Sequence, residues 1–82
     1  MLTAKEIEDR IVMRLKELVP ADQLPQDPSA LRSACLGDLP LDSLDLLTLA
    51  MKLEDDIGRV IEMDAIDESL SVSELAAELS VA

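Results

Sequence analysis

Leu39-Pro40-Leu41-Asp42-Ser43-Leu44 opens the stretch that decides the fold. Pro40 cannot continue a preceding helix, so it separates the following residues from whatever comes before. Asp42 and Ser43 are both good N-cap residues, because their side-chain oxygens can accept the free N–H groups of a first helical turn. Gly58 is typical of a helix C-terminus. The stretch therefore predicts a central helix from Asp42 or Ser43 to about Gly58.

On a helical wheel, this segment has one apolar stripe and one charged face. The stripe is the core-facing side of an amphipathic helix and contains Leu46, Leu49, Ala50, Leu53 and Ile57. The charged face is expected to meet water and contains Asp45, Lys52 and Asp56. We interpret the acidic run at residues 54–56 as a solvated helix end.

A third face of the same helix carries further large apolar residues. They are Leu44, Leu47 and Met51, with Thr48 and Asp55 along the edge. A helix buried more deeply than average would explain this surplus. A docking surface would explain it too, and the neighbouring serine, which is expected to be exposed, favours that interpretation.

The composition is that of a small soluble helical protein. The 82 residues, 49% of them hydrophobic, predict one domain over residues 1–82. Phe, Tyr and Trp are absent, so the core consists of aliphatic residues and Met and is adaptable in shape. The single cysteine, Cys35, excludes an internal disulfide and suits a reducing cytoplasm. Because no segment resembles a signal peptide or a membrane span, we expect a cytoplasmic protein without membrane insertion.

The charge is strongly acidic, with 7 basic and 18 acidic residues and a formal net charge of −11. This charge disfavours binding to nucleic acid or to an anionic membrane surface. It favours partner proteins with basic patches, because electrostatic attraction would speed their encounter with this acidic chain.

The first helix is expected to start at a capping box, Thr3-x-x-Glu6, and to end at Val19-Pro20. Its core stripe recurs at helical spacing through Ile7, Ile11, Leu15 and Leu18. Its opposite face should be solvated and carries Lys5, Glu8, Asp9, Lys16 and Glu17.

A long connection from Pro20 to Ser43 follows, and a connection of this length needs buried anchors. We expect the anchors to be Leu31, Leu36 and Leu39, with a short helical turn at residues 27–34. After Gly58, residues 59–61 should be extended and residues 63–66 a single helical turn.

A second capping box, Ser71-x-x-Glu74, predicts a last helix that runs to the terminus. Its apolar face contains Val72, Leu75, Ala76 and Leu79.

The chain lacks the residues of most catalytic sites. Without histidine, neither a Ser-His pair nor a histidine metal site can form. Two glycines cannot build a phosphate-binding loop, and the carboxylates do not have EF-hand spacing. We therefore predict that the protein is not an enzyme, and that Ser43 is a substrate of another enzyme.

The motif Leu39-x-Leu41-Asp42-Ser43-Leu44-Asp45, with the apolar helix and Glu54-Asp55-Asp56-Ile57-Gly58 after it, resembles the acyl carrier proteins. The resemblance implies an all-α four-helix bundle with a long loop between the first two helices and a short third helix. It also implies that 4′-phosphopantetheine is attached to Ser43 by a phosphopantetheinyl transferase. The thiol of this group would carry an acyl group as a thioester to enzymes of fatty-acid, polyketide or related biosynthesis.

The resemblance also assigns roles to the helix around Ser43. Leu44, Leu47 and Met51 would supply apolar contacts to the partner enzymes that load and process the acyl group. Asp42, Asp45 and Asp55 would match the basic docking patches of these enzymes. We expect the carrier to act as a monomer.

Several residues differ from the common family pattern. Pro40 replaces a glycine, Thr48 an acidic residue and Ile57 an aromatic residue, and Ile61-Glu62 stands where Ile-Pro is common. These differences favour a specialised carrier over the housekeeping fatty-acid type. Carriers of D-alanine or other amino acids also use Asp-Ser, so an aminoacyl cargo stays open. The alternative from another class is an unmodified acidic helical protein that binds a basic partner.

Overall fold

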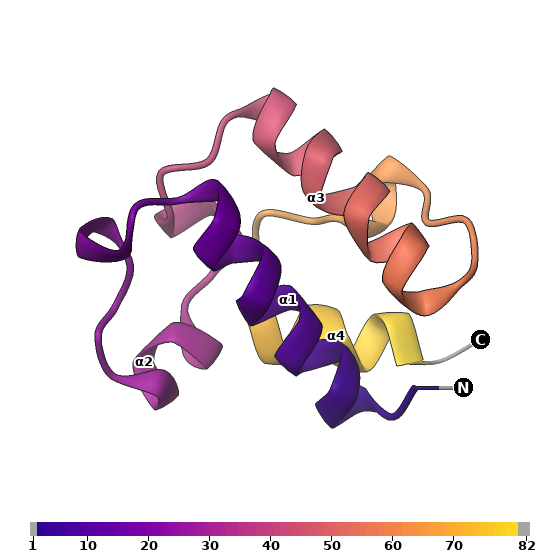
Figure 1. Ribbon diagram of the computed structural model, residues 1–82, viewed down its shortest axis with the longest axis horizontal. Coiled ribbons are helices and arrows are strands. Elements are labelled where there is room, and N and C mark those ends of the chain that lie inside the picture. Colours follow the sequence, from indigo (N-terminus) through magenta and orange to yellow (C-terminus); the bar gives the residue numbers. More distant parts are fainter. Residues whose placement is uncertain (1, 81–82) are drawn as a thin grey trace.

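The computed structural model describes residues 2–80, and within them the chain forms four α-helices, three short 3-10 helices and no strand (Figure 1). The α-helices are α1 (Ala4–Leu18), α2 (Pro28–Ser33), α3 (Ser43–Ile57) and α4 (Val72–Ser80). The 3-10 helices are η1 (Ala21–Gln23), η2 (Leu36–Asp38) and η3 (Met63–Ala65). Helix α1 packs against both α3 and α4, and α2 lies against α4. The prediction of an all-α bundle is confirmed.

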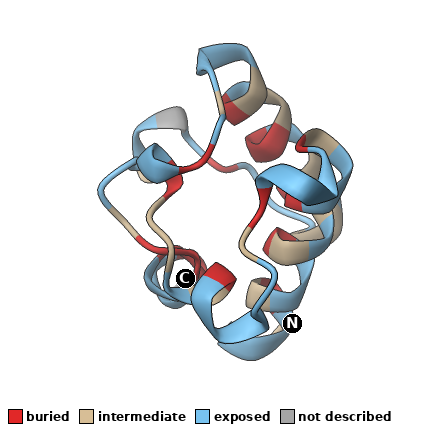
Figure 2. Cartoon of the chain, turned by 90° about the vertical axis from the view of Figure 1, so that its left-hand side faces the viewer, coloured by how far each residue is buried: buried red, intermediate tan, exposed pale blue. Residues whose placement is uncertain are grey.

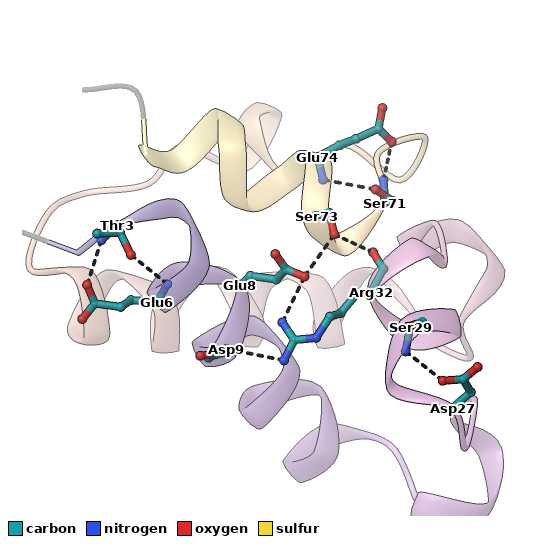
Figure 3. Close-up of polar contacts among 10 residues, drawn as sticks. All are labelled: Thr3, Glu6, Glu8, Asp9, Asp27, Ser29, Arg32, Ser71, Ser73 and Glu74. Carbon is teal, nitrogen blue, oxygen red and sulfur yellow. Dashed lines mark hydrogen bonds and ion pairs between the residues drawn. The ribbon is translucent and has the colours of Figure 1, made fainter.

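Both predicted capping boxes are present (Figure 3). The Glu6 N–H donates to Thr3 Oγ1 at 3.2 Å, and the Thr3 N–H donates to Glu6 Oε1 at 3.2 Å. At the start of α4, the Ser71 N–H donates to Glu74 Oε1 at 2.9 Å and the Glu74 N–H to Ser71 Oγ at 3.1 Å. Each pair satisfies two N–H groups that a helix start leaves free.

The buried residues lie on the inward sides of the helices and on the connections between them (Figure 2). Ile7, Ile11 and Leu15 are buried as predicted, but Leu18 is only partly buried. Val19 takes the next core position, because the chain leaves the helix after Leu18 and its extended backbone turns Val19 inward.

The long connection between α1 and α3 is anchored by Leu31, Leu36 and Leu39, all buried as predicted. Its expected helical turn is the α-helix α2, whose start is capped by Asp27: the Ser29 N–H donates to Asp27 Oδ1 at 3.0 Å.

Three backbone hydrogen bonds join this connection to the segment that leads into α4 and to the first residue of α4. The Leu36 N–H donates to the Leu70 carbonyl at 3.1 Å, the Gly37 N–H to Glu68 at 2.9 Å, and the Val72 N–H to Ala34 at 3.2 Å. A Cβ atom on Gly37 would stand 3.2 Å from the Glu68 carbonyl oxygen, a tight contact, so the close approach favours glycine. The loop that leads to Ser43 is thereby attached to the opposite end of the chain.

The expected short third helix is η3, a single 3-10 turn, and residues 59–62 before it are neither helix nor strand. A 3-10 turn is the usual form of a helix this short. The four α-helices are therefore not the four that were expected. The expected short third helix is a 3-10 turn, and the fourth α-helix is α2, which lies in the long connection between α1 and α3.

The outer face of α1 is less solvated than the sequence suggested. Arg32 of α2 contacts Glu8 Oε1 at 2.9 Å and Asp9 Oδ1 at 2.8 Å (Figure 3). The Ser73 hydroxyl of α4 donates to Glu8 Oε1 at 3.1 Å. The prediction of a solvated face is wrong for Glu8, because α2 and α4 bring partners to it, whereas Asp9 pairs with Arg32 but stays exposed as predicted.

Candidate functional site

The start of α3 is closed by two aspartates. The Asp45 N–H donates to Asp42 Oδ1 at 2.8 Å, and the Asp42 N–H donates to Asp45 Oδ2 at 3.2 Å. Asp42 is therefore the N-cap, and Ser43 is the first helical residue. Of the two cap candidates, only Asp42 acts as the cap, which frees the Ser43 side chain from that role.

Ser43 is exposed at this helix start. No hydrogen bond to its hydroxyl is present among residues 2–80, and the first-turn N–H groups of Ser43 and Leu44 also lack partners there. These free N–H groups and the positive end of the helix dipole favour a phosphate group beside Ser43. The residues around Ser43 thus fit a phosphodiester on its oxygen.

The C-terminal end of α3 is fixed by Gly58 and Glu54. Gly58 has φ 84°, the left-handed conformation that ends many helices, and its N–H donates to the Glu54 carbonyl at 2.8 Å. The Glu54 carboxylate accepts the Ile61 N–H at 2.8 Å. Glu54 therefore holds the following loop, and the prediction of a solvated helix end is wrong for this residue.

Asp56 ties α3 to α1. The Arg14 guanidinium donates to both Asp56 carboxylate oxygens, through Nε at 2.8 Å and through Nη2 at 2.7 Å. These hydrogen bonds hold the pKa of Asp56 below its usual value, and they raise the pKa of Arg14. The Asp56 side chain is only 8% exposed, so the prediction that it lies on a solvated face of the helix is wrong.

The core stripe of α3 turns toward α1, and Leu46, Leu49, Ala50 and Leu53 are buried as predicted, whereas Ile57 is partly buried. The third face points to solvent. Its exposed fractions are 68% for Leu44, 41% for Leu47 and 57% for Met51. Of the two explanations for the apolar surplus, the structure excludes deep burial.

The predicted acidic partner residues do not form one cluster. Asp42 and Asp45 lie together at the start of α3, while Asp55 is exposed near its end. The helical rise places Asp55 about 15 Å from Asp45 along the axis. Thr48, at the edge of the third face, uses its hydroxyl to donate to the Leu44 carbonyl at 2.9 Å.

Two residues just beyond the end of α3 remote from Ser43 gave no signal in the sequence. Val60 is 81% exposed just after α3, and the guanidinium of Arg59 donates to the Leu79 carbonyl of α4. Both positions depend on where the loop after Gly58 runs. That loop is not helical, so the helical periodicity of the sequence does not predict its course.

A family model described as a phosphopantetheine attachment site matches residues 13–79. The chain belongs to the acyl carrier protein family. Members of this family carry 4′-phosphopantetheine covalently and work with a phosphopantetheinyl transferase and partner enzymes. The matched segment of this carrier contains Ser43 and all of α2 and α3, together with the C-terminal part of α1 and all but the last residue of α4. No curated protein and no solved structure matches the chain significantly.

Within residues 2–80 of the carrier, no group of three or more Cys, Asp or Glu side chains is placed to hold a metal ion. No helix in this part of the chain combines the length and apolar character that a membrane crossing needs.

Proposed function

We propose that Ser43 is the attachment residue and that the carrier holds an acyl group as a thioester for enzymes of fatty-acid, polyketide or related biosynthesis. One observation carries the proposal: an exposed serine at the start of α3, whose hydroxyl has no hydrogen-bond partner among residues 2–80, lies inside the segment that matches the family. The attached group supplies the flexible thiol that forms the thioester.

The residues around Ser43 prepare it as a substrate and not as a catalyst. Deprotonation of its hydroxyl requires a base, and the chain has no histidine. The nearest carboxylates, Asp42 and Asp45, accept the backbone N–H groups of each other and so shape the helix start. The base therefore comes from the transferase, and the carrier itself is not an enzyme.

The exposed face of α3 is the proposed docking face, defined by Leu44, Leu47 and Met51. Apolar side chains that stay in water on the free carrier gain by burial against a partner enzyme. Asp42 and Asp45 at one end and Asp55 at the other offer charge to a basic patch. Arg14 and Asp56 hold the opposite side of α3 on α1, which keeps the docking face turned outward.

Composition supports the remaining parts of the proposal. The net charge of −11 keeps copies of the carrier apart and favours a monomer. A lone cysteine suits the cytoplasm. The departures at Pro40, Thr48 and Ile57 support a specialised carrier.

Intact-mass measurement tests the attachment. Incubated with coenzyme A and a broad-specificity phosphopantetheinyl transferase, the carrier should gain one phosphopantetheine. Ser43→Ala should gain none, whereas Ser33→Ala, which removes another exposed serine, should gain one. An unchanged wild-type mass, with a transferase that modifies another carrier in the same mixture, would refute the proposal and favour the unmodified acidic interaction protein.

A further inference from the structure

Helix α3 contains one basic residue, Lys52, among four acidic ones. Two of the acidic residues are engaged within the carrier, since Glu54 accepts a backbone N–H and Asp56 accepts two hydrogen bonds from a guanidinium. The other two are Asp45, which is partly exposed, and Asp55, which is exposed. The charges that α3 itself can offer to a partner are therefore two negative ones and the positive charge of Lys52.

Lys52 lies between these two carboxylates, both around the helix and along it. Counted around the axis from Leu44, the helical repeat places Asp55 at about 20°, Lys52 at about 80° and Asp45 at about 100°. Along the axis, Lys52 lies about 10 Å beyond Asp45 and about 5 Å before Asp55. A partner surface that covers the docking face and reaches both carboxylates must therefore pass over Lys52.

The carrier holds the Lys52 ammonium only loosely. Its one ion-pair contact within residues 2–80 is to Glu17 Oε1 of α1, at 4.0 Å, and the two side chains are 40% and 46% exposed. The same Glu17 oxygen already accepts a hydrogen bond from Arg14 at 2.9 Å. An exposed pair of this kind contributes little to stability, and the ammonium keeps N–H donors for a partner.

A positive charge in this position distinguishes between two kinds of basic patch. A patch made only of lysine and arginine can pair with Asp45 and Asp55, but it also places a positive group opposite Lys52. That like-charge contact slows the encounter and weakens the complex. A patch that has a carboxylate at this point avoids the repulsion and gains an ion pair with Lys52.

We propose that Lys52 determines which partner enzymes the docking face accepts. It selects enzymes whose basic patch contains a carboxylate opposite Lys52, and it disfavours enzymes whose patch is basic throughout. The inference rests on the proposed attachment at Ser43 and on docking through α3, and it adds the kind of partner that this face fits.

Attachment rates test this inference with a phosphopantetheinyl transferase whose docking patch is basic throughout. At low salt, Lys52→Glu should raise kcat/KM about 3–10-fold above wild type, mainly through a lower KM, because repulsion becomes attraction. Lys52→Met removes the charge and should give a smaller gain. Both gains should shrink at high salt, where the charges are screened. Lys16→Glu makes the same change in net charge at an exposed position of α1 and should alter kcat/KM less than about 2-fold.

The partner side is tested by replacing the basic residues of the transferase patch with glutamate, one at a time. At the residue that faces Lys52, the replacement should reverse the preference, so that the wild-type carrier is modified faster than Lys52→Glu. A Lys52→Glu variant that is no faster than Lys16→Glu would overturn the inference, as would a transferase patch in which no replacement reverses the preference. Intact mass shows attachment separately, so a carrier that gains no phosphopantetheine refutes the attachment at Ser43, whereas equal rates refute only the role of Lys52.

Discussion

Replacing Leu53 and Met51 with alanine, one variant at a time, separates the core face of α3 from its docking face. Leu53 has no exposed surface and lies in the middle of the stripe that packs toward α1. Truncation of such a leucine leaves a cavity and costs about 2–5 kcal/mol of unfolding free energy. Met51, two residues earlier, is 57% exposed, so most of its side chain is already in water.

The exposed fractions set the expected size of each effect. Full burial of a methionine contributes about 1.5–3 kcal/mol, and less than half of this is at stake for Met51, or about 1 kcal/mol. In a domain of this length, 1 kcal/mol shifts Tm by about 4–8 °C. Met51→Ala should therefore lower Tm by at most about 8 °C. Leu53→Ala should lower it by at least about 8 °C and can unfold a protein whose total stability is about 4–12 kcal/mol.

The same two variants should behave oppositely with a partner enzyme. Loss of Met51 removes an apolar anchor near Ser43, so phosphopantetheinylation of the folded protein should slow. Whatever fraction of Leu53→Ala stays folded should be modified at nearly the wild-type rate. Thermal melts and initial rates at fixed transferase concentration measure both effects. A Met51→Ala variant that melts early but is modified normally would refute the docking face, because Met51 would then belong to the core.

Three further predictions concern stability. Raising salt from low to physiological strength should increase Tm, because screening weakens repulsion among 18 acidic residues; an unchanged Tm would show locally balanced charges. Lowering the pH from 7 toward 5 should also raise Tm, but below about pH 4 stability should fall. Hydrogen bonds from Arg14 lower the pKa of Asp56 in the folded state, so the ionised carboxylate stabilises the fold at any pH above the pKa that it has in the unfolded chain. This stabilisation is lost as the pH falls through the lower pKa of the folded state. Asp56→Asn should be less stable at neutral pH and should show a shallower acid decline in a pH series of melts. Gly58→Ala should cost about 1 kcal/mol in chemical denaturation, because φ 84° strains any side chain although the site is open; an unchanged stability would contradict that reason.

Local patterns in the sequence determined much of this protein. The capping boxes at Thr3 and Ser71 and the core stripe of α3 involve residues within one or two helical turns, so their geometry follows from the helix itself. The same reasoning placed Ser43 at an exposed helix start. It left the identity of the cap open, because Asp and Ser cap equally well and only the backbone position distinguishes them.

The tertiary structure alone decided which charges are paired and which apolar residues stay exposed. Arg14 and Asp56 are 42 residues apart, and they meet because α1 and α3 pack together. The helical pattern predicted that Leu46 is buried, but only the packing of the other elements decided that Leu44 on the third face stays exposed. A recess of about 230 Å³ between Leu2, Ile57 and Leu79 likewise exists because the ends of α3 and α4 converge near the start of the chain. Contacts of this kind depend on how the helices are arranged in space, and a sequence pattern with the period of one helix carries no information about that arrangement.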